Sequence, residues 1–149
     1  MRNWRVLNMM DVSHCPKALD PLREIAEVVT VPPDEGELLR RIPDFDAYFA
    51  TLQVRVTPRI LDAAKRLRVI ASSATGTDHL DLPCCEKKGV HIIHLKYDTD
   101  FLDKVTATAE MGWALMLAAL RKLPWSFEAA RRGEWARDRF RGRMISGKT

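Results

Sequence analysis

The sequence contains few cysteines, no long apolar run and no Gly-x-Gly-x-x-Gly motif. Its three cysteines cannot all pair with one another, and Cys84 and Cys85 are adjacent, so reduced thiols in the cytosol are the simplest interpretation. The longest apolar stretch, Met111 to Leu120, is shorter than the roughly 20 residues that cross a bilayer. The ends show no basic-then-apolar leader. We therefore expect a cytoplasmic protein with no membrane segment.

The composition is that of an ordinary globular chain, but the charge is unevenly distributed. Of the 149 residues, 46% are hydrophobic and 30% are charged, and the net charge is +4. The segment 121–148 holds nine Lys or Arg against three acids, which gives +6 there and −2 elsewhere. Such a segment indicates a nucleic acid or a protein partner. Its aromatic residues form no known RNA-binding pattern, so we expect a protein surface and no nucleic acid.

Short β-branched runs alternate with helical patterns over the first two thirds of the chain. The predicted strands are Trp4–Met9, Glu27–Val31, Asp46–Thr51, Arg68–Ser73 and Val90–His94. Strand–helix alternation with short loops predicts an α/β fold in which helices cover both faces of a parallel sheet. About five strands without the glycine motif favour the flavodoxin-like doubly wound order.

Helix starts are marked by capping residues and prolines. Each predicted helix begins at one of these signals: Asp20-Pro21, Asp34 with Glu37 (a capping box, helix to Arg41), Thr57-Pro58, and Asp81 (helix ending at Gly89). The apolar face of the first is predicted to include Leu22 and Ile25, and that of the third Ile60, Leu61, Ala64 and Leu67.

The character of the chain changes after Tyr97. Thr106 to Leu123 is predicted to form one helix that is apolar nearly all round, and such a helix must be buried on most sides. Pro124 begins a further helix that ends at Gly133, and loop is expected from Glu134. This pattern predicts a domain over residues 1–104, followed by connecting helices over 105–149.

Several segments, taken in order, resemble the D-isomer-specific 2-hydroxyacid dehydrogenase family. They are Thr57–Leu61, Leu67–Asp81 with its strand and glycine turn, Val105–Glu110, Arg131–Trp135 and Gly147–Thr149. Two positions depart from the family pattern, because Ala74 replaces a usual glycine and Met111 stands where many members carry His. The resemblance covers residues 46–149 firmly and the earlier ones weakly.

The resemblance implies the substrate-binding part of an NAD-dependent oxidoreductase acting on a small D-2-hydroxy or 2-keto acid. It also implies that the chain is truncated before the NAD-binding domain, which would begin at Gly147–Thr149. It implies that Thr75 and Gly76 bind the substrate carboxylate, that Leu52 and Gln53 contact the substrate, and that Thr108 contacts the cofactor. The family's catalytic Arg, Glu and His and its dinucleotide motif have no counterpart here. No residue is therefore predicted to be catalytic, the chain alone is expected to be inactive and to bind no cofactor, and the choice between NAD and NADP in the parent stays open.

Without the resemblance, each candidate has an ordinary structural explanation. Gly76 permits a tight strand–helix turn, Leu52 and Gln53 belong to a loop, and Thr108 bonds its own helix. Zinc is not expected, since His91 and His94 point to opposite faces of a strand and the cysteines lack ligand spacing. Neither the cysteine pair at 84–85 nor the serine pair at 72–73 fits a nucleophile pattern.

Two expectations about the whole chain complete the sequence interpretation. The alternative function is a stand-alone flavodoxin-like domain that binds a small anion at the Thr75–Gly76 turn or serves in an interaction. The apolar helix and its basic continuation predict a homo-oligomer formed through residues 105–144, because a five-stranded domain can bury only one side of such a helix.

Overall fold

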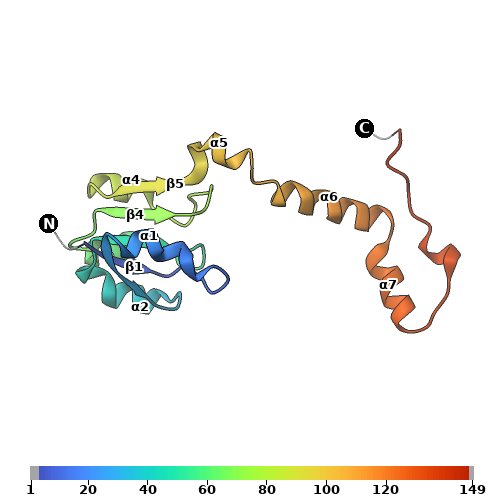
Figure 1. Ribbon diagram of the computed structural model, residues 1–149, viewed down its shortest axis with the longest axis horizontal. Helices are drawn as coiled ribbons and strands as arrows, with labels where there is room; N and C mark the ends of the chain where they lie inside the picture. Colours follow the sequence, from blue (N-terminus) through green and yellow to red (C-terminus); the bar gives the residue numbers. More distant parts are fainter. Residues whose placement is uncertain (1–3, 148–149) are drawn as a thin grey trace. The chain divides into compact units, whose positions relative to one another are not determined.

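The computed structural model describes residues 4–147 and divides the chain into two units, Met1–Thr99 and Asp100–Thr149 (Figure 1). The first unit contains a five-stranded sheet, with strands β1 (Trp4–Asn8), β2 (Ala26–Thr30), β3 (Ala47–Ala50), β4 (Val69–Ser72) and β5 (His91–His94). All pairings are parallel, and the order is β2-β1-β3-β4-β5. This is the flavodoxin-like order, so the predicted α/β fold class is confirmed.

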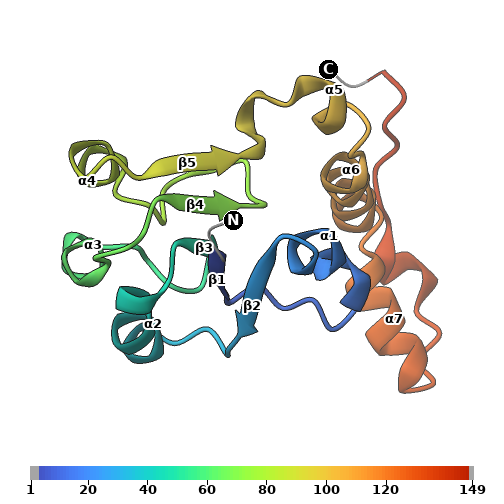
Figure 2. The same ribbon diagram turned by 60° about the vertical axis from the view of Figure 1, so that its left-hand side comes forward.

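Helices connect the strands on both sides of the sheet. They are α1 (Asp20–Arg23), α2 (Glu35–Arg41), α3 (Pro58–Ala63) and α4 (Leu82–Lys87), with short 3₁₀ turns at η1 (Pro16–Leu19), η2 (Ile42–Asp44) and η3 (Leu95–Tyr97). Figure 2 shows α2, α3 and α4 along one face and α1 on the other. The two faces are therefore unequally covered.

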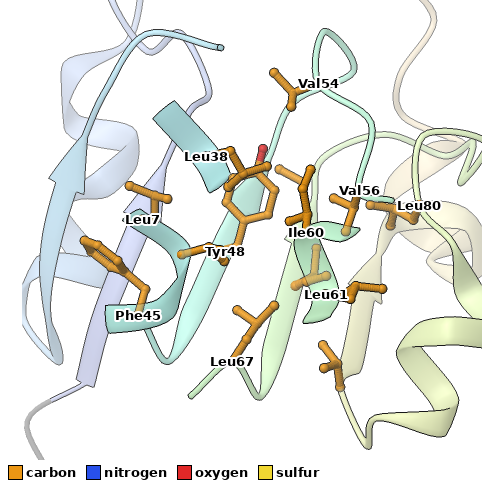
Figure 3. Packing of buried hydrophobic residues seen from close by; sticks show 14 of the residues in the cluster. Leu7, Leu38, Phe45, Tyr48, Val54, Val56, Ile60, Leu61, Leu67 and Leu80 are labelled. Atoms are coloured by element: carbon orange, nitrogen blue, oxygen red, sulfur yellow. The ribbon is translucent and has the colours of Figure 1, made fainter. Parts of the chain in front are cut away.

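The hydrophobic core lies between the sheet and the helices α2, α3 and α4, which cover one of its faces. Along β3, Tyr48 and Ala50 are buried while Ala47 and Phe49 are half-buried, because successive side chains of a strand point to opposite faces. Figure 3 shows side chains from the sheet and from the helices pointing toward one another. The cluster includes Leu7, Leu38, Tyr48, Ile60, Leu61, Ile70 and Cys85.

Two predicted helix caps are confirmed by their hydrogen bonds. The Asp34 carboxylate accepts from the Glu37 N–H at 2.8 Å, and the Asp81 carboxylate accepts from the Cys84 N–H at 2.9 Å. Gly89 follows α4 with a φ of +67°, the left-handed conformation that glycine adopts at least cost after a helix. The capping residues in the sequence therefore predicted the positions of α2 and α4 correctly.

For the helix predicted to begin at Asp20, both the predicted capping residue and the predicted length are wrong. Asp20 lies inside the helix with αR dihedrals, since η1 runs directly into α1, and α1 ends after four residues. Ile25, assigned to the apolar face, is 72% exposed. Pairing of residues 26–30 with β1 takes the chain out of the helix. The third helix also ends early, at Ala63, so Leu67 joins the core from the loop after it.

From Thr99, the last residue of the first unit, the chain forms helices: α5 (Thr99–Leu102), α6 (Ala107–Leu120), α7 (Leu123–Arg131) and the 3₁₀ turn η4 (Arg137–Phe140). The prediction of one helix from Thr106 to Leu123 is wrong at its end. Lys122 adopts left-handed dihedrals, with φ 54° and ψ 34°, and so separates α6 from α7. The turn η4 was also not expected, because loop was predicted from Glu134.

Helix α6 is apolar yet contains no buried residue. Its exposed side chains include Met111, Trp113, Leu115, Met116 and Leu117. In the basic continuation, Arg132 pairs with Glu128 and Glu134, and Arg141 with Asp138, so part of its charge is balanced locally. Within residues 4–147, no helix combines the length and apolarity that a membrane span requires.

Candidate functional site

The candidate site lies where β3 and β4 end. Ala50 pairs with Ser72 as the last residue of each strand, so the loops 51–57 and 73–81 begin side by side. Parallel strands bring their carboxyl ends to the same edge of the sheet, and open α/β sheets bind ligands at that edge. The topology therefore places the loop that holds Leu52 and Gln53 beside the loop that holds Thr75 and Gly76.

Backbone hydrogen bonds join the two loops. The Val56 N–H donates to the His79 carbonyl at 2.7 Å, and the Asp81 N–H donates to the Val56 carbonyl at 3.1 Å. Val56 and Leu80 also form a parallel bridge. In addition, Arg55 Nη2 donates to the Asp78 carbonyl at 3.0 Å. The loops consequently form one connected rim.

A concave surface of about 390 Å³ lies on this rim, lined by Leu52, Arg55, Gly76, Asp78 and His79. A second concavity of about 490 Å³ shares three of these residues and extends toward the start of α3 and α4. The structure therefore brings Leu52 and Gly76 to the same hollow. Sequence reasoning missed Arg55 and His79, which stand in the same loops without a recognisable motif.

The turn itself presents free backbone donors. The N–H groups of Thr75 and Gly76 donate to no atom of residues 4–147, and both residues are exposed. A Cβ added at Gly76 would meet only Asp78 Oδ2, at 3.9 Å, so the space above this glycine is open. Successive unpaired N–H groups in a turn can bind an anion. The nearby Arg55 guanidinium adds positive charge, while the Asp78 carboxylate opposes it.

Ser72 and His79 form a buried polar pair beneath the turn. Ser72 Oγ lies 3.2 Å from His79 Nε2 and accepts a hydrogen bond from the Ala74 N–H, also at 3.2 Å. Burial lowers the pKa of His79, and the Asp78 carboxylate opposes this shift without overcoming it. The His79 Nδ1 atom has no partner within the described residues, so the pair lacks the third group of a catalytic triad.

The remaining predicted site residues differ in their surroundings. The Gln53 N–H donates to Thr51 Oγ1 at 3.3 Å, and the Gln53 side chain is exposed on the rim. Thr108 is the second residue of α6 and belongs to the other unit. Its side chain bonds to nothing in residues 4–147, whereas Thr106 Oγ1 donates to Glu110 at 2.6 Å. The backbone bond expected of Thr108 as an ordinary helix-start residue is therefore not present, and the N-cap Thr106 makes none either.

No metal-binding cluster of three or more His, Cys, Asp or Glu occurs in the part of the chain that the structure describes. Cys85 is fully buried, and burial is the main reason that its pKa rises to about 11. A thiol with such a pKa carries almost no thiolate at neutral pH and is a poor nucleophile.

The family is established by comparison with known proteins. The family model described as "D-isomer specific 2-hydroxyacid dehydrogenase, catalytic domain" matches residues 6–112. The chain belongs to this family. The resemblance deduced from the sequence is thereby confirmed, and the comparisons do not favour the alternative of a stand-alone anion-binding or interaction domain.

Individual known proteins are similar to this chain over part of their length. It is 32% identical to the D-3-phosphoglycerate dehydrogenase of Archaeoglobus fulgidus, over 76% of this chain and 20% of that protein. It is 39% identical to the glyoxylate reductase of Thermococcus onnurineus, over 76% of this chain and 34% of that protein. The TT0316 protein from Thermus thermophilus matches with a TM-score of 0.78 and 31% identity, over 93% of this chain and 44% of that one. The chain spans less than half the length of each.

Proposed function

We propose that this chain is the substrate-binding part of an NAD(P)-dependent oxidoreductase that acts on the CH–OH group of a small D-2-hydroxy acid. The observation that carries the proposal is the pair of unpartnered N–H groups at Thr75 and Gly76, in a turn whose Gly76 lines a hollow at the carboxyl ends of β3 and β4. Family membership supplies the reaction class. One relative is named for D-3-phosphoglycerate, a 2-hydroxy acid, and another for glyoxylate, a 2-keto acid.

The substrate carboxylate would be held by the backbone of the turn. The N–H groups of Thr75 and Gly76 would donate to its oxygens, while Leu52 and Gln53 would bound the rest of the small acid. Arg55 would add a positive charge to the hollow, held in place by its hydrogen bond to the Asp78 carbonyl. This arrangement orients the C2 carbon of the acid by fixing the carboxyl group beside it.

The residues of this chain do not fit a dinucleotide. The N–H groups of Thr75 and Gly76 do not belong to the first turn of a helix, because α4 begins only at Leu82, six positions after Gly76. The nicotinamide would supply or accept the hydride in the parent enzyme, with Thr108 contacting the cofactor, and the proton-transferring residues would come from the parent's cofactor-binding part. We therefore assign no catalytic residue here and expect the chain alone to be inactive. We also expect a cytoplasmic protein that has no nucleic-acid partner.

The site is tested by titrating glyoxylate into ¹⁵N-labelled protein. The Thr75 and Gly76 amide signals should shift saturably, with a millimolar dissociation constant, because a single wall of the site is present. Acetate should shift the same signals, and acetamide, its neutral isostere, should not. Arg55→Gln should weaken the binding of both anions. Saturable shifts that avoid residues 52–79 would contradict the assignment.

The absence of cofactor binding is tested separately. NADH fluorescence should not change when the protein is added at micromolar concentration, and no oxidation of D-lactate, D-glycerate or D-3-phosphoglycerate should occur above the blank. Micromolar NADH binding or turnover would show that this chain contains more than the substrate part.

The apolar surface of α6 supports the proposal that the chain self-associates through residues 105–144. Trp113 and Leu115 are 59% and 62% exposed, and burying such a side chain contributes roughly 1.5–3 kcal/mol. Two copies can cover these side chains symmetrically.

A further inference from the structure

Ser72 and His79 stand at the two ends of the segment that contains the carboxylate turn. Ser72 is the last residue of β4, His79 follows seven positions later, and both are 6% exposed. The bond between Ser72 Oγ and His79 Nε2 links the two ends, and the Ala74 N–H donates to the same oxygen. One buried hydroxyl therefore connects the start of the turn to its end.

The backbone at His79 is fixed independently of this side-chain bond. Its carbonyl accepts from the Val56 N–H, and Leu80 forms a bridge with Val56. The imidazole consequently projects from an anchored position, and Ser72 extends from a strand of the sheet. By contrast, residues 75–78 have few bonds of their own, since only the Thr77 and Asp78 carbonyls accept hydrogen bonds among the described residues. Apart from these carbonyl bonds and the bond from the Leu95 N–H to the Ala74 carbonyl, the Ser72–His79 bond is the contact that braces the turn.

The buried position favours the neutral imidazole over the charged one. With its proton on Nε2, the neutral ring donates to Ser72 Oγ and carries no hydrogen at Nδ1. A charged ring would carry a second N–H at Nδ1, where no acceptor exists within residues 4–147. The charged side chains that line the concave surfaces around His79 are Arg55, Asp78 and Asp81. Of these, only Asp78 acts on the pKa of His79, and burial outweighs it.

We propose that His79, as a neutral imidazole bonded to Ser72, is a positioning residue that holds the Thr75–Gly76 turn in the form that receives a carboxylate. This inference rests on the proposed function and deepens it by assigning the control of that site. We expect acidification to break the Ser72–His79 bond and so to loosen the Thr75–Gly76 turn. The pKa of His79 is lowered in the buried position, so a detached imidazole binds protons more readily at pH values just below 6.5, and acidification favours detachment.

The first experiment compares His79→Gln with His79→Phe in the full 149-residue chain. The terminal amide of Gln can occupy the place of Nε2, whereas Phe fills the volume without a hydrogen bond. His79→Phe should lower the ¹⁵N order parameters of residues 74–77 and weaken glyoxylate binding roughly 2- to 10-fold, the effect of losing one hydrogen bond. His79→Gln should restore both quantities. His91→Gln, at an exposed histidine of β5, is the matched control.

Ser72→Ala provides an independent route to the same loss, because Ala fits the buried position without a hydroxyl. It should loosen the turn as much as His79→Phe does, and the double variant should add little further loss. Urea unfolding of each variant would identify any that fail to fold. If Ser72→Ala folds and leaves both the order parameters and glyoxylate affinity unchanged, the positioning role is overturned.

The pH profile distinguishes positioning from a merely structural role. Glyoxylate affinity of the wild-type chain should fall as the pH is lowered from 7.5 to 5, and that of His79→Gln should stay level. Imidazole ¹⁵N shifts should show a neutral ring at pH 6.5. A wild-type affinity that does not change with pH overturns the inference. If the wild-type chain shows no glyoxylate-dependent shift at all, the proposed function fails, whereas the order parameters in the absence of ligand still report on the Ser72–His79 bond.

Discussion

Arg66 Nη2 donates to the buried carboxylate of Asp46 at 3.0 Å, where β3 begins. The same carboxylate accepts the Arg5 N–H at 3.1 Å, and the Asp46 carbonyl accepts the Arg68 N–H at 2.8 Å. Asp46 thus joins β1, β3 and the loop before β4 at the amino ends of the strands, opposite the candidate site. A carboxylate without solvent contact depends on such partners, because burial of an uncompensated charge is costly.

Arg66→Met should therefore destabilise the fold. Arg66 is itself 43% exposed, so the cost should exceed about 1 kcal/mol but stay below the roughly 3–5 kcal/mol seen when a fully buried pair is broken. Lys65→Met changes the neighbouring exposed cation and should cost less than about 0.5 kcal/mol. Urea unfolding at pH 7 measures both. Equal stability of the two variants would show that the ion pair contributes nothing.

Two isoleucines of neighbouring strands should respond differently to truncation. Ile70 in β4 is completely buried in the core cluster, and Ile70→Ala should cost about 2–5 kcal/mol through lost contacts and a cavity. Ile93 in β5 is 53% exposed, so Ile93→Ala should cost well under half of that. Thermal and urea unfolding give the comparison. A larger loss at Ile93 would mean that the face of the sheet away from α2, α3 and α4 is also covered in solution.

The cysteines should differ in reactivity. Cys15 is exposed, whereas Cys85 is buried with a pKa raised to about 11. At pH 8, iodoacetamide should modify Cys15 first and reach Cys85 only after unfolding, as judged by peptide mass spectrometry. The pKa of Cys85 is raised from 9.0 to about 11 by folding, so the unfolded chain loses this proton first and stability should fall between about pH 9 and 11. Cys85→Ala should remove that part of the pH dependence. Fast alkylation of Cys85 in the native protein would contradict its burial.

Self-association through 105–144 should depend on the apolar side chains of α6. Light scattering coupled to size exclusion should show a mass that rises with concentration. The double variant Trp113→Gln, Leu117→Gln places two polar side chains one turn apart on α6 and should shift the protein toward monomer. Tyr97→Gln, at a side chain that is 78% exposed outside the segment, is the control. A monomer at every concentration, with the segment resistant to protease, would rule out pairing between copies.

Local sequence signals were enough to place the sheet and two of its helix caps. Each of the five predicted strands overlaps an observed one, and Asp34 and Asp81 cap the helices that they were expected to cap. These features depend on neighbours within a few residues, such as a carboxylate reaching an N–H three positions later. The predictions at Asp20 and Leu123 failed because strand pairing with β1 and a left-handed residue at Lys122 overrode the local helical pattern.

The candidate site was only half determined by the sequence. The glycine turn and the family pattern indicated Thr75 and Gly76, and the parallel order implied that Leu52 would lie near them. Ser72 was considered only as a nucleophile, and Arg55 and His79 carried no local signal. Their roles follow from contacts across the rim: Arg55 reaches a carbonyl 23 positions away, and His79 meets a serine at the end of β4. Only folding brings these atoms within hydrogen-bonding distance and removes the imidazole from water, so only the tertiary structure could decide them.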